Sequence, residues 1–343
     1  MHRLLVLGGA GFFGSRISAS VRDAAGVRVL LAGRRPAPLA AMAQELGLGS
    51  DAVVAIDAHD AAFATTLRAL DVNTVVHTAG PFQGQDQGVA RACIDAGANY
   101  IDIADGRDFV AGVCCLDEAA RQRGVLVTTG ASSLPALSSA VVDRYAPRFD
   151  RLDAIRIGIG SGARSPGLAT VRGIFGYCGK AFTRLEDGVP RVVHGWADTQ
   201  QHDFPPPVGK RLLGSCDVPD LALFPQRYAH LRTVTFHGGF AAAWGHRAVA
   251  IGAWAVQRGL LTSLAPLAPL LHGVARRMEG WVSDKGGMFV DMRGVARDGS
   301  PLRLIWHLVA ASNHGPHTPC GAAMALVRKL ARGDALPHGA QSL

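Results

Sequence analysis

Short apolar runs alternate with amphipathic stretches along the first 130 residues. Runs of strand length occupy residues 3–7, 27–32, 52–56, 74–77, 100–103 and 125–128. Stretches with helical spacing lie between them, at residues 14–24, 36–46, 60–70, 88–96 and 113–122. Most of the strand candidates are apolar at consecutive positions, which is typical of a parallel sheet covered by helices on both faces. The alternation therefore predicts an α/β fold whose first domain, residues 1–130, is a doubly wound parallel sheet.

The pattern changes from residue 131 onward. Strand candidates at 152–159, 191–196, 231–237, 288–296 and 302–310 alternate in polarity or are rich in β-branched residues. Asp298-Gly299, between the last two, predicts a hairpin turn. Helical candidates lie at 168–182, 241–257, 260–278 and 320–332, and the proline-rich segment 201–210 is expected to be a surface loop. We predict a second, α+β domain over residues 131–343, with a largely antiparallel sheet and with the helix at 320–332 packing back on the first domain.

A glycine-rich turn follows the first predicted strand. It consists of Gly9, Ala10, Gly11, Phe12, Phe13 and Gly14, which fill a G-x-G-x-x-G pattern. In such a turn the first glycine permits a tight bend, the second admits a pyrophosphate to the backbone, and the third lets helix and strand pack closely. The following helix N-terminus offers N–H groups to the phosphates. The turn predicts a dinucleotide-binding Rossmann domain; the alternative is a purely structural glycine turn.

The end of the second predicted strand indicates which dinucleotide is bound. Arg34 and Arg35 stand where an NAD-binding domain usually carries the acidic residue that holds the ribose 2′-hydroxyl. A guanidinium can pair with a 2′-phosphate and stack on adenine, so we predict NADP(H) as the cofactor. The alternative is a pair of solvated loop arginines. The other residues expected at the cofactor are Asp57, near the adenine end, and Thr78, Ala79 and Gly80, near the nicotinamide half.

Composition excludes several classes of protein. Of the 343 residues 48% are hydrophobic and 18% charged, which excludes intrinsic disorder as the main state. The formal net charge of +8 comes from scattered arginines rather than a basic run, so no nucleic-acid partner is expected. Six cysteines without a C-x-x-C pair predict neither a disulfide framework nor a metal site.

The location of the protein is predicted from the same sequence. We find no secretory signal, because the apolar run at residues 1–7 is too short and breaks into glycines. The uncharged stretch at residues 259–275 contains two prolines and is shorter than a bilayer span. We therefore expect a cytoplasmic protein with no integral membrane segment.

Several segments resemble the saccharopine dehydrogenase/reductase-like family. The likeness is strongest over residues 1–145, in the stretches VLGGAGFFG (6–14), LAGRR (31–35), VVHTAGPFQ (75–83), ACIDAGANYIDIAD (92–105) and GASSLPALSSAVVD (130–143). The resemblance implies an N-terminal dinucleotide-binding domain and a substrate domain that often mediates dimerisation, so a homodimer is expected. Characterised members of the family form or break C–N bonds through an imine and a nicotinamide hydride. The family also includes lipid-linked enoyl reductases.

Three side chains are candidates for catalysis. A nicotinamide-dependent reductase needs a proton donor, and a nearby carboxylate stabilises the charge of a protonated imine. Asp102 and Asp105 follow the fifth strand and suit this role; the alternative is that Asp102 caps a loop and Asp105 forms a turn. Lys285, within the glycine loop 283–287, could hold a substrate carboxylate or donate a proton, or else be an exposed loop lysine.

Three functions are compatible with these features. The first is an NADPH-dependent oxidoreductase that transfers a hydride to an imine or carbonyl of a small-molecule substrate. The second is an enoyl or keto reductase for a hydrophobic or lipid-like substrate, suggested by the largely uncharged segment 248–275. That segment could equally be a dimer interface or a membrane-surface contact. The third is an NADP-binding sensor or scaffold that has kept the fold without catalysis.

Overall fold

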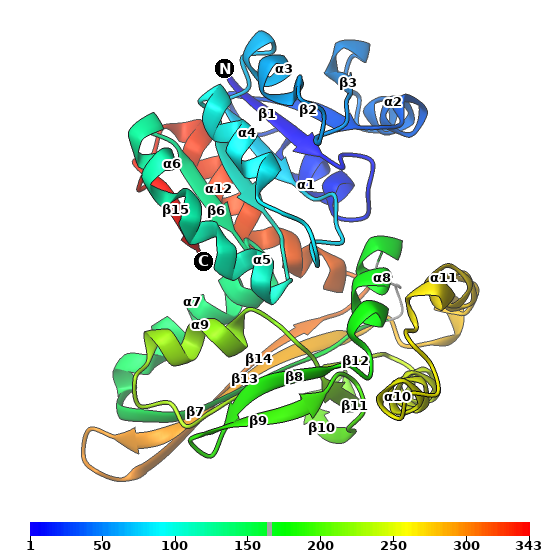
Figure 1. Cartoon of the computed structure of the whole chain (residues 1–343), viewed down its shortest axis with the longest axis vertical. Coiled ribbons are helices and arrows are strands. Elements are labelled where there is room, and N and C mark those ends of the chain that lie inside the picture. The colour runs from blue at the N-terminus through cyan, green and yellow to red at the C-terminus, as the bar shows by residue number, and fades with distance from the viewer. Residues whose placement is uncertain (163–166) are drawn as a thin grey trace. The chain divides into compact units, whose positions relative to one another are not determined.

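A computed structural model describes residues 1–162 and 167–343 and divides the chain into two units (Figure 1). The first unit comprises Met1–Leu137 together with His317–Leu343, and the second comprises Ser138–Pro316. The first unit thus ends later than residue 130, and the segment from His317 to the C-terminus belongs to it rather than to the second unit. The helix expected at 320–332 is present as α12 (Gly321–Arg332) and packs on α1 (Gly14–Val21).

The first unit contains a seven-stranded parallel sheet with the strand order β15-β6-β5-β4-β1-β2-β3. Its strands are β1 (His2–Leu7), β2 (Val27–Gly33), β3 (Val53–Ala55), β4 (Thr74–His77), β5 (Asn99–Asp102), β6 (Leu126–Thr129) and β15 (Gly339–Ser342). The first six correspond to the six predicted apolar runs. The α/β fold with a doubly wound parallel sheet is therefore confirmed.

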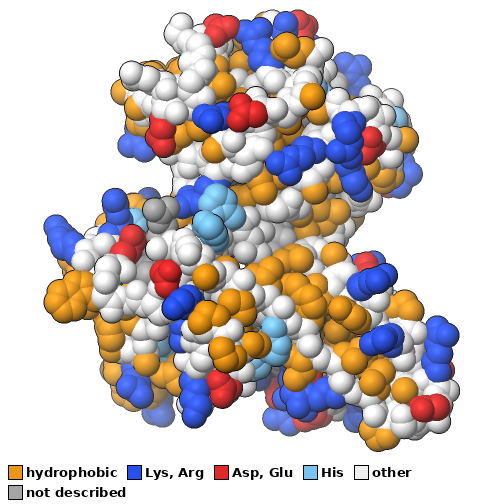
Figure 2. All heavy atoms as spheres, turned by 180° about the vertical axis from the view of Figure 1, so that it is seen from behind, with side chains coloured by type: hydrophobic (Ala, Val, Ile, Leu, Met, Phe, Trp, Pro, Cys, Tyr) orange, Lys and Arg blue, Asp and Glu red, His pale blue; other side chains and the backbone are white. Residues whose placement is uncertain are grey.

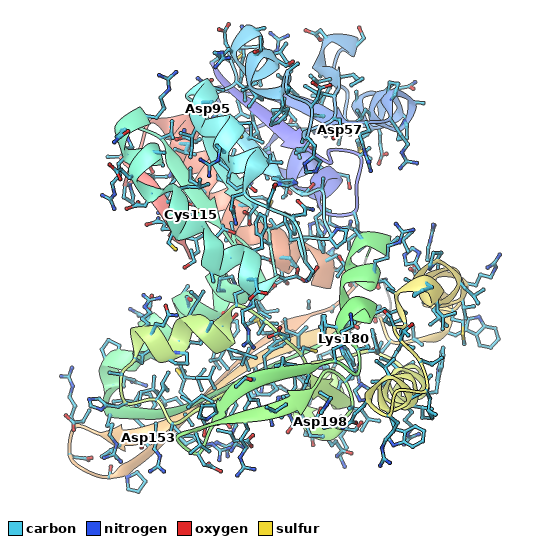
Figure 3. The ribbon with its side chains drawn as sticks, in the orientation of Figure 1. Asp57, Asp95, Cys115, Asp153, Lys180 and Asp198 are labelled. Carbon is cyan, nitrogen blue, oxygen red and sulfur yellow. The ribbon has the colours of Figure 1, made fainter. Side chains whose placement is uncertain are left out.

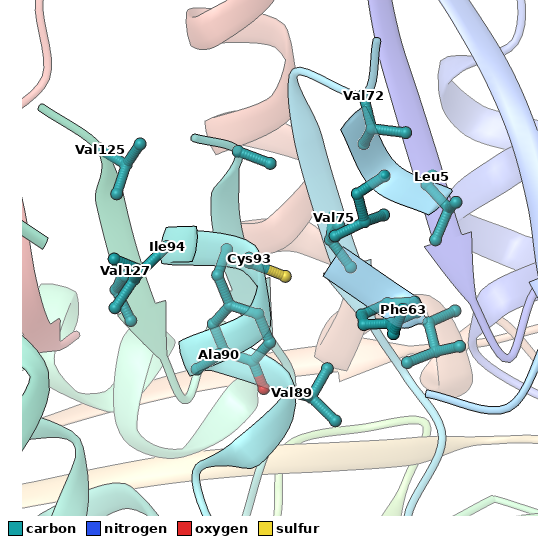
Figure 4. Close-up of a cluster of buried hydrophobic side chains, with 14 of the residues drawn as sticks. Leu5, Phe63, Val72, Val75, Val89, Ala90, Cys93, Ile94, Val125 and Val127 are labelled. Carbon is teal, nitrogen blue, oxygen red and sulfur yellow. The ribbon is translucent and has the colours of Figure 1, made fainter. Parts of the chain in front are cut away.

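Helices cover both faces of this sheet (Figure 1). Besides α1 and α12 they are α2 (Pro36–Glu45), α3 (Phe63–Ala69), α4 (Gly88–Ala96), α5 (Arg107–Gly112) and α6 (Asp117–Arg123). Helices α3, α4 and α6 pack side by side, and beneath them lies a buried cluster that includes Phe63, Val75, Val89 and Cys93 (Figure 4). Successive residues of a strand point to opposite faces, so strands buried on both sides require the continuous apolar runs seen in the sequence.

Two elements of the first unit escaped the sequence pattern. Strand β15 has the sequence GAQS, which carries no hydrophobic periodicity, and it pairs in parallel with β6 through Gly339 and Leu126. Helix α5 spans only six residues, too few to show a clear helical repeat. Pairing at a sheet edge and docking on an existing core stabilise such segments, and neither is visible in local sequence.

The second unit contains a six-stranded mixed sheet with the order β10-β11-β12-β7-β13-β14, and a separate hairpin of β8 and β9. The strands are β7 (Phe149–Gly160), β8 (Ala181–Glu186), β9 (Val189–His194), β10 (Gln200–Phe204), β11 (Gly209–Ser215), β12 (Thr233–Gly239), β13 (Gly286–Ala296) and β14 (Pro301–Ala310). Only β12 and β7 pair in parallel, so the sheet is largely antiparallel as predicted. The predicted turn at Asp298-Gly299 joins β13 to β14, with Gly299 at φ +82°.

The helices of the second unit differ in part from those predicted. They are α7 (Ser138–Tyr145), α8 (Leu168–Tyr177), α9 (Asp220–Arg227), α10 (Ala243–Gln257) and α11 (Ala268–Arg277). The helix expected at 168–182 ends at Tyr177, and Phe182 belongs to β8. The helix expected at 260–278 begins only at Ala268, because Pro266 and Pro269 are tolerated in the first turn of a helical segment but not inside one.

The surface loop expected at 201–210 was a wrong prediction. Strands β10 and β11 form an antiparallel hairpin there, with Phe204 opposite Gly209. The three prolines fall in the connecting turn, where no ladder N–H is needed. Strand β10 could not be predicted from hydrophobic periodicity, because it is an edge strand whose side chains are largely polar and exposed.

Figure 2 shows one face of the molecule, with basic side chains scattered among apolar and neutral ones rather than gathered in one stripe. Within the part of the chain that the structure describes, no helix is both long enough and apolar enough to cross a membrane.

Candidate cofactor site

The turn between β1 and α1 has little or no room for a side chain at its glycine positions. Gly8 adopts φ +84°, and its carbonyl oxygen accepts a hydrogen bond from the N–H of Gly11 at 2.7 Å. A Cβ on Gly14 would lie 2.2 Å from the Gly8 oxygen, and a Cβ on Gly11 would lie 2.9 Å from it. A Cβ on Gly9 would lie 3.0 Å from the Leu31 side chain. The residues present therefore fit the close backbone approach that a pyrophosphate requires.

The N-terminus of α1 is open for an anion. Phe13 occupies the N-cap without a side-chain hydrogen bond, and the first turn contains no acidic residue. Arg16 from this helix donates to the Phe12 carbonyl, and its guanidinium lies 4.0 Å from the centre of the Phe12 ring. Uncapped N–H groups and the positive end of the helix dipole favour phosphate binding. Arg16 fixes the Phe12 side of the turn and was not among the residues predicted from the sequence.

The ends of β2 and β3 carry the residues expected at the adenine side. Arg34 and Arg35 are exposed, and among residues 1–162 and 167–343 neither forms an ion pair or hydrogen bond through its side chain. Parallel pairing of Gly33 with Ala55 brings these two strand ends together. Asp57, labelled in Figure 3, is exposed just beyond β3 and accepts a hydrogen bond from the His59 N–H at 3.1 Å. Two unpaired guanidinium groups at this edge are suited to a 2′-phosphate.

The loop after β4 contacts the glycine turn directly. The Thr78 hydroxyl donates to the Leu7 carbonyl at 2.9 Å, and a Cβ on either Gly8 or Gly14 would lie 2.8 Å from this hydroxyl oxygen. Ala79 and Gly80 continue the loop, which is held by Gln85: its side-chain amide donates to the Ala79 carbonyl at 3.1 Å. The predicted phosphate and nicotinamide segments thus meet at the carboxyl ends of β1 and β4, the switch point of the sheet.

Asp102 is a buried structural acceptor at the end of β5. Its Oδ1 accepts hydrogen bonds from the N–H groups of Ala104 and Gly130, at 2.9 and 2.8 Å, and from the Thr129 hydroxyl at 3.0 Å. Burial raises the pKa of Asp102 to about 6, although these hydrogen bonds oppose the rise. This geometry supports the structural alternative for Asp102, because the carboxylate ties the end of β5 to the end of β6.

Asp105 lies in a more accessible place than Asp102. It is half-buried, and its Oδ1 accepts a hydrogen bond at 3.1 Å from the side-chain amide of Gln83, at the end of the loop after β4. Burial raises the pKa of Asp105 above its ordinary value. A partly accessible carboxyl with a raised pKa, next to the predicted nicotinamide segment, is suited to moving a proton.

A buried histidine under the same loop was not singled out from the sequence. His77, the last residue of β4, shares a hydrogen bond of 2.9 Å with the Tyr100 hydroxyl, and its ring lies 5.1 Å from the Phe82 ring. Burial lowers the pKa of His77 to about 4, so the ring is neutral at neutral pH. Its place in the stretch VVHTAGPFQ was visible, but nothing in the sequence showed that Tyr100 faces it from the next strand.

Lys285 belongs to the second unit and immediately precedes β13. Its N–H donates to the Ser283 hydroxyl at 3.3 Å, and its carbonyl accepts from Arg211 at 3.3 Å, while the side chain is partly exposed.

Within the described part of the chain no three His, Cys, Asp or Glu side chains are grouped to hold a metal ion. Four of the six cysteines are buried and two, Cys114 and Cys115, are exposed.

Comparisons with known proteins agree with this geometry. Residues 4–144 match the family described as the saccharopine dehydrogenase NADP binding domain. The fold is similar to that of apo saccharopine dehydrogenase (L-Glu forming) from Saccharomyces cerevisiae, with a TM-score of 0.69 and 14% identity over 100% of this chain and 94% of that one. It is also similar to a probable dehydrogenase from Thermotoga maritima, with a TM-score of 0.52 and 10% identity over 97% of this chain and 88% of that one. No curated protein sequence matches the chain. At these identities the structures establish the fold, and the family match establishes an NADP-binding domain.

Proposed function

We propose that this chain, whose residues 4–144 match the saccharopine dehydrogenase NADP binding domain, is an NADPH-dependent reductase of an imine or carbonyl group in a small metabolite. The proposal depends on two features. The α1 N-terminus has no side-chain cap and follows a turn whose glycines leave no room for side chains, and two unpaired arginines lie at the end of β2. A dinucleotide with a 2′-phosphate satisfies both features at once.

Each group of residues would have its own role in binding and reaction. Bound NADPH supplies the hydride, and the chain supplies orientation and a proton. Gly9 to Gly14 and the α1 N-terminus hold the pyrophosphate, Arg34 and Arg35 hold the 2′-phosphate, and Thr78 to Gly80 position the nicotinamide half. Asp105 is the proton donor in this proposal, because its carboxyl is partly accessible and its pKa is raised. Asp102 positions the loop ends of β5 and β6 instead of exchanging protons with the substrate.

The second unit would hold the substrate in this proposal. Lys285 would bind an anionic group of the metabolite, which is one of the roles that the sequence left open for it. A homodimer in the cytoplasm remains part of the proposal, and light scattering of the purified protein measures the oligomeric state. An enoyl or keto reductase for a lipid-like substrate is the second candidate, since exposed leucines and tryptophans gather on α10 and α11.

Calorimetric titration with NADPH and NADH tests the cofactor assignment. We expect Arg34→Ala to weaken NADPH binding by roughly 1–3 kcal/mol, about 5–150-fold, because one charge-assisted contact to the 2′-phosphate is lost. NADH binding should change little. Arg297→Ala is the matched control, since Arg297 is an exposed arginine in the β13–β14 turn of the second unit. Equal losses for both cofactors would contradict the 2′-phosphate assignment.

Turnover of Asp105→Asn tests the proton donor. With a panel of imines and ketones, we expect kcat to fall by about 10²–10⁴-fold while NADPH affinity is retained. Asp95→Asn, at an exposed aspartate on α4, is the control. Unchanged kcat in Asp105→Asn would remove Asp105 from the mechanism, and absence of turnover by the wild-type protein with every substrate class would favour the sensor alternative.

A further inference from the structure

Helix α10 and the segment through α11 expose a large set of apolar side chains. On α10, Trp244, Ile251 and Trp254 are 51%, 67% and 47% exposed, and their spacing places them on one side of the helix. The set continues through the following chain with Leu260, Leu261, Leu267, Leu270, Leu271, Val274 and Trp281. Trp281 is 87% exposed. Such a concentration is unusual for a surface that faces only water.

These side chains are not needed for the core of the second unit. Helix α10 packs through its opposite side, where His246 and Ala253 are fully buried. The chain after α10 folds back on it, since a Cβ on Gly252 would lie 2.9 Å from the Leu264 side chain. Helix α11 in turn packs on α8. The segment from α10 to α11 is therefore anchored to the second unit while one side of it leaves apolar side chains exposed. We call residues 243–281 the α10–α11 hairpin.

The charges on this hairpin are mainly positive. Arg247, Arg258, Arg276 and Arg277 are exposed, and Glu279 is the one acidic residue of the hairpin. Within the described residues none of these four arginines forms an ion pair, and Arg258 lies 5.6 Å from the Trp254 ring centre. With four exposed arginines and one acidic residue, the hairpin carries a net positive charge beside its apolar side chains.

We propose that the α10–α11 hairpin docks on an anionic lipid surface and makes this protein a peripheral membrane protein. Tryptophan and leucine favour the headgroup–acyl boundary, and arginine stems extend along apolar surface while their guanidinium groups reach lipid phosphates. A second copy of the chain fits less well, because two identical hairpins would bring four arginines of each copy together with a single acid, Glu279, from each. Helices α10 and α11 have 15 and 10 residues, too few to cross a bilayer, so the proposed contact lies in the interface plane.

Sedimentation with vesicles tests this proposal on the full chain. We expect binding to vesicles of equimolar phosphatidylcholine and phosphatidylserine, and at least tenfold weaker partitioning to phosphatidylcholine alone. The double variant Trp254→Ser, Trp281→Ser and the double variant Arg276→Glu, Arg277→Glu should each lower partitioning at least tenfold. Val192→Ser and Arg297→Glu are controls, because both residues are exposed but lie outside the hairpin. NADPH binding should be unchanged in every variant.

A second measurement covers the possibility that a variant misfolds. Brominated lipids in the mixed vesicles should quench the tryptophan fluorescence of the wild-type protein, since three of its five tryptophans lie on the hairpin. Equal sedimentation of wild type and both variants, or no quenching, would overturn the proposal. A concentration-dependent dimer that the tryptophan variant abolishes, without lipid binding by the wild type, would assign the hairpin to a second copy instead.

Discussion

Replacing Asp102 by Asn should remove the part of the pH dependence of stability in the first unit that comes from ionisation of this carboxyl. The wild-type carboxyl is fully buried, and its Oδ1 accepts three hydrogen bonds, from two backbone N–H groups and the Thr129 hydroxyl. Asn has the same shape and keeps this acceptor. The Oδ2 atom is buried without a hydrogen-bond partner among the described residues, and there the variant would place an amide NH₂. The substitution therefore removes the charge and keeps the three contacts.

The size of the effect follows from the pKa of Asp102, which burial raises from 3.8 to about 6. Between these values the folded state binds more protons than the unfolded state, so the free energy of unfolding falls as pH rises. Each pKa unit corresponds to about 1.4 kcal/mol, so ionisation of Asp102 costs about 3 kcal/mol by neutral pH. The Asn variant lacks this cost, while its unpaired NH₂ costs about 1–3 kcal/mol at every pH.

The difference in unfolding free energy, variant minus wild type, should therefore rise by about 2–2.5 kcal/mol from pH 4 to pH 7, because part of the cost is already present at pH 4. Urea unfolding followed by far-ultraviolet circular dichroism measures it. All five tryptophans lie in the second unit, so a transition seen by dichroism but not by tryptophan fluorescence reports the first unit. Asp95→Asn, at an exposed carboxylate, is the control and should show no such slope.

A flat difference across this pH range would refute the reasoning, because it would mean that the three hydrogen bonds outweigh burial and hold the pKa of Asp102 near its ordinary value. Asp102→Ala gives the complementary result. It leaves buried donors without an acceptor at about 1–3 kcal/mol each, so the first unit should be destabilised at all pH values. Equal stability of the Ala and Asn variants would show that the acceptor at the end of β5 is unimportant.

Two further predictions concern the glycine turn and the thiols. Gly14→Ala places a Cβ 2.2 Å from the Gly8 oxygen; we expect calorimetry to show at least about tenfold weaker NADPH binding. The tryptophan-detected unfolding of the second unit should be unchanged, and intact NADPH affinity would contradict the geometry of the turn. Under native conditions a disulfide reagent should modify Cys114 and Cys115 quickly and the four buried cysteines only on unfolding. Rapid modification of Cys114→Ser, Cys115→Ser protein would contradict the burial of the others.

The sequence by itself determined the architecture of the first unit. Strands buried on both faces must be continuously apolar, and the helices between them must be amphipathic. The α/β alternation could therefore be predicted from the local sequence. The glycine turn was equally local, because the close approach of Gly14 to Gly8 admits no side chain whatever the rest of the chain does. Arg34 and Arg35 were found for the same reason, since their place depends only on the end of β2.

Only the tertiary structure decided what depends on neighbours distant in sequence. The polar strand β15 joins the sheet by pairing with β6, and β10 forms a hairpin where the prolines suggested a loop. Asp102 and Asp105 looked alike in sequence, but Asp102 accepts from residues of the β6 end whereas Asp105 stays half-buried beside Gln83. Burial and hydrogen bonding set the pKa and accessibility of a carboxyl, and both arise from contacts between strands rather than from local sequence.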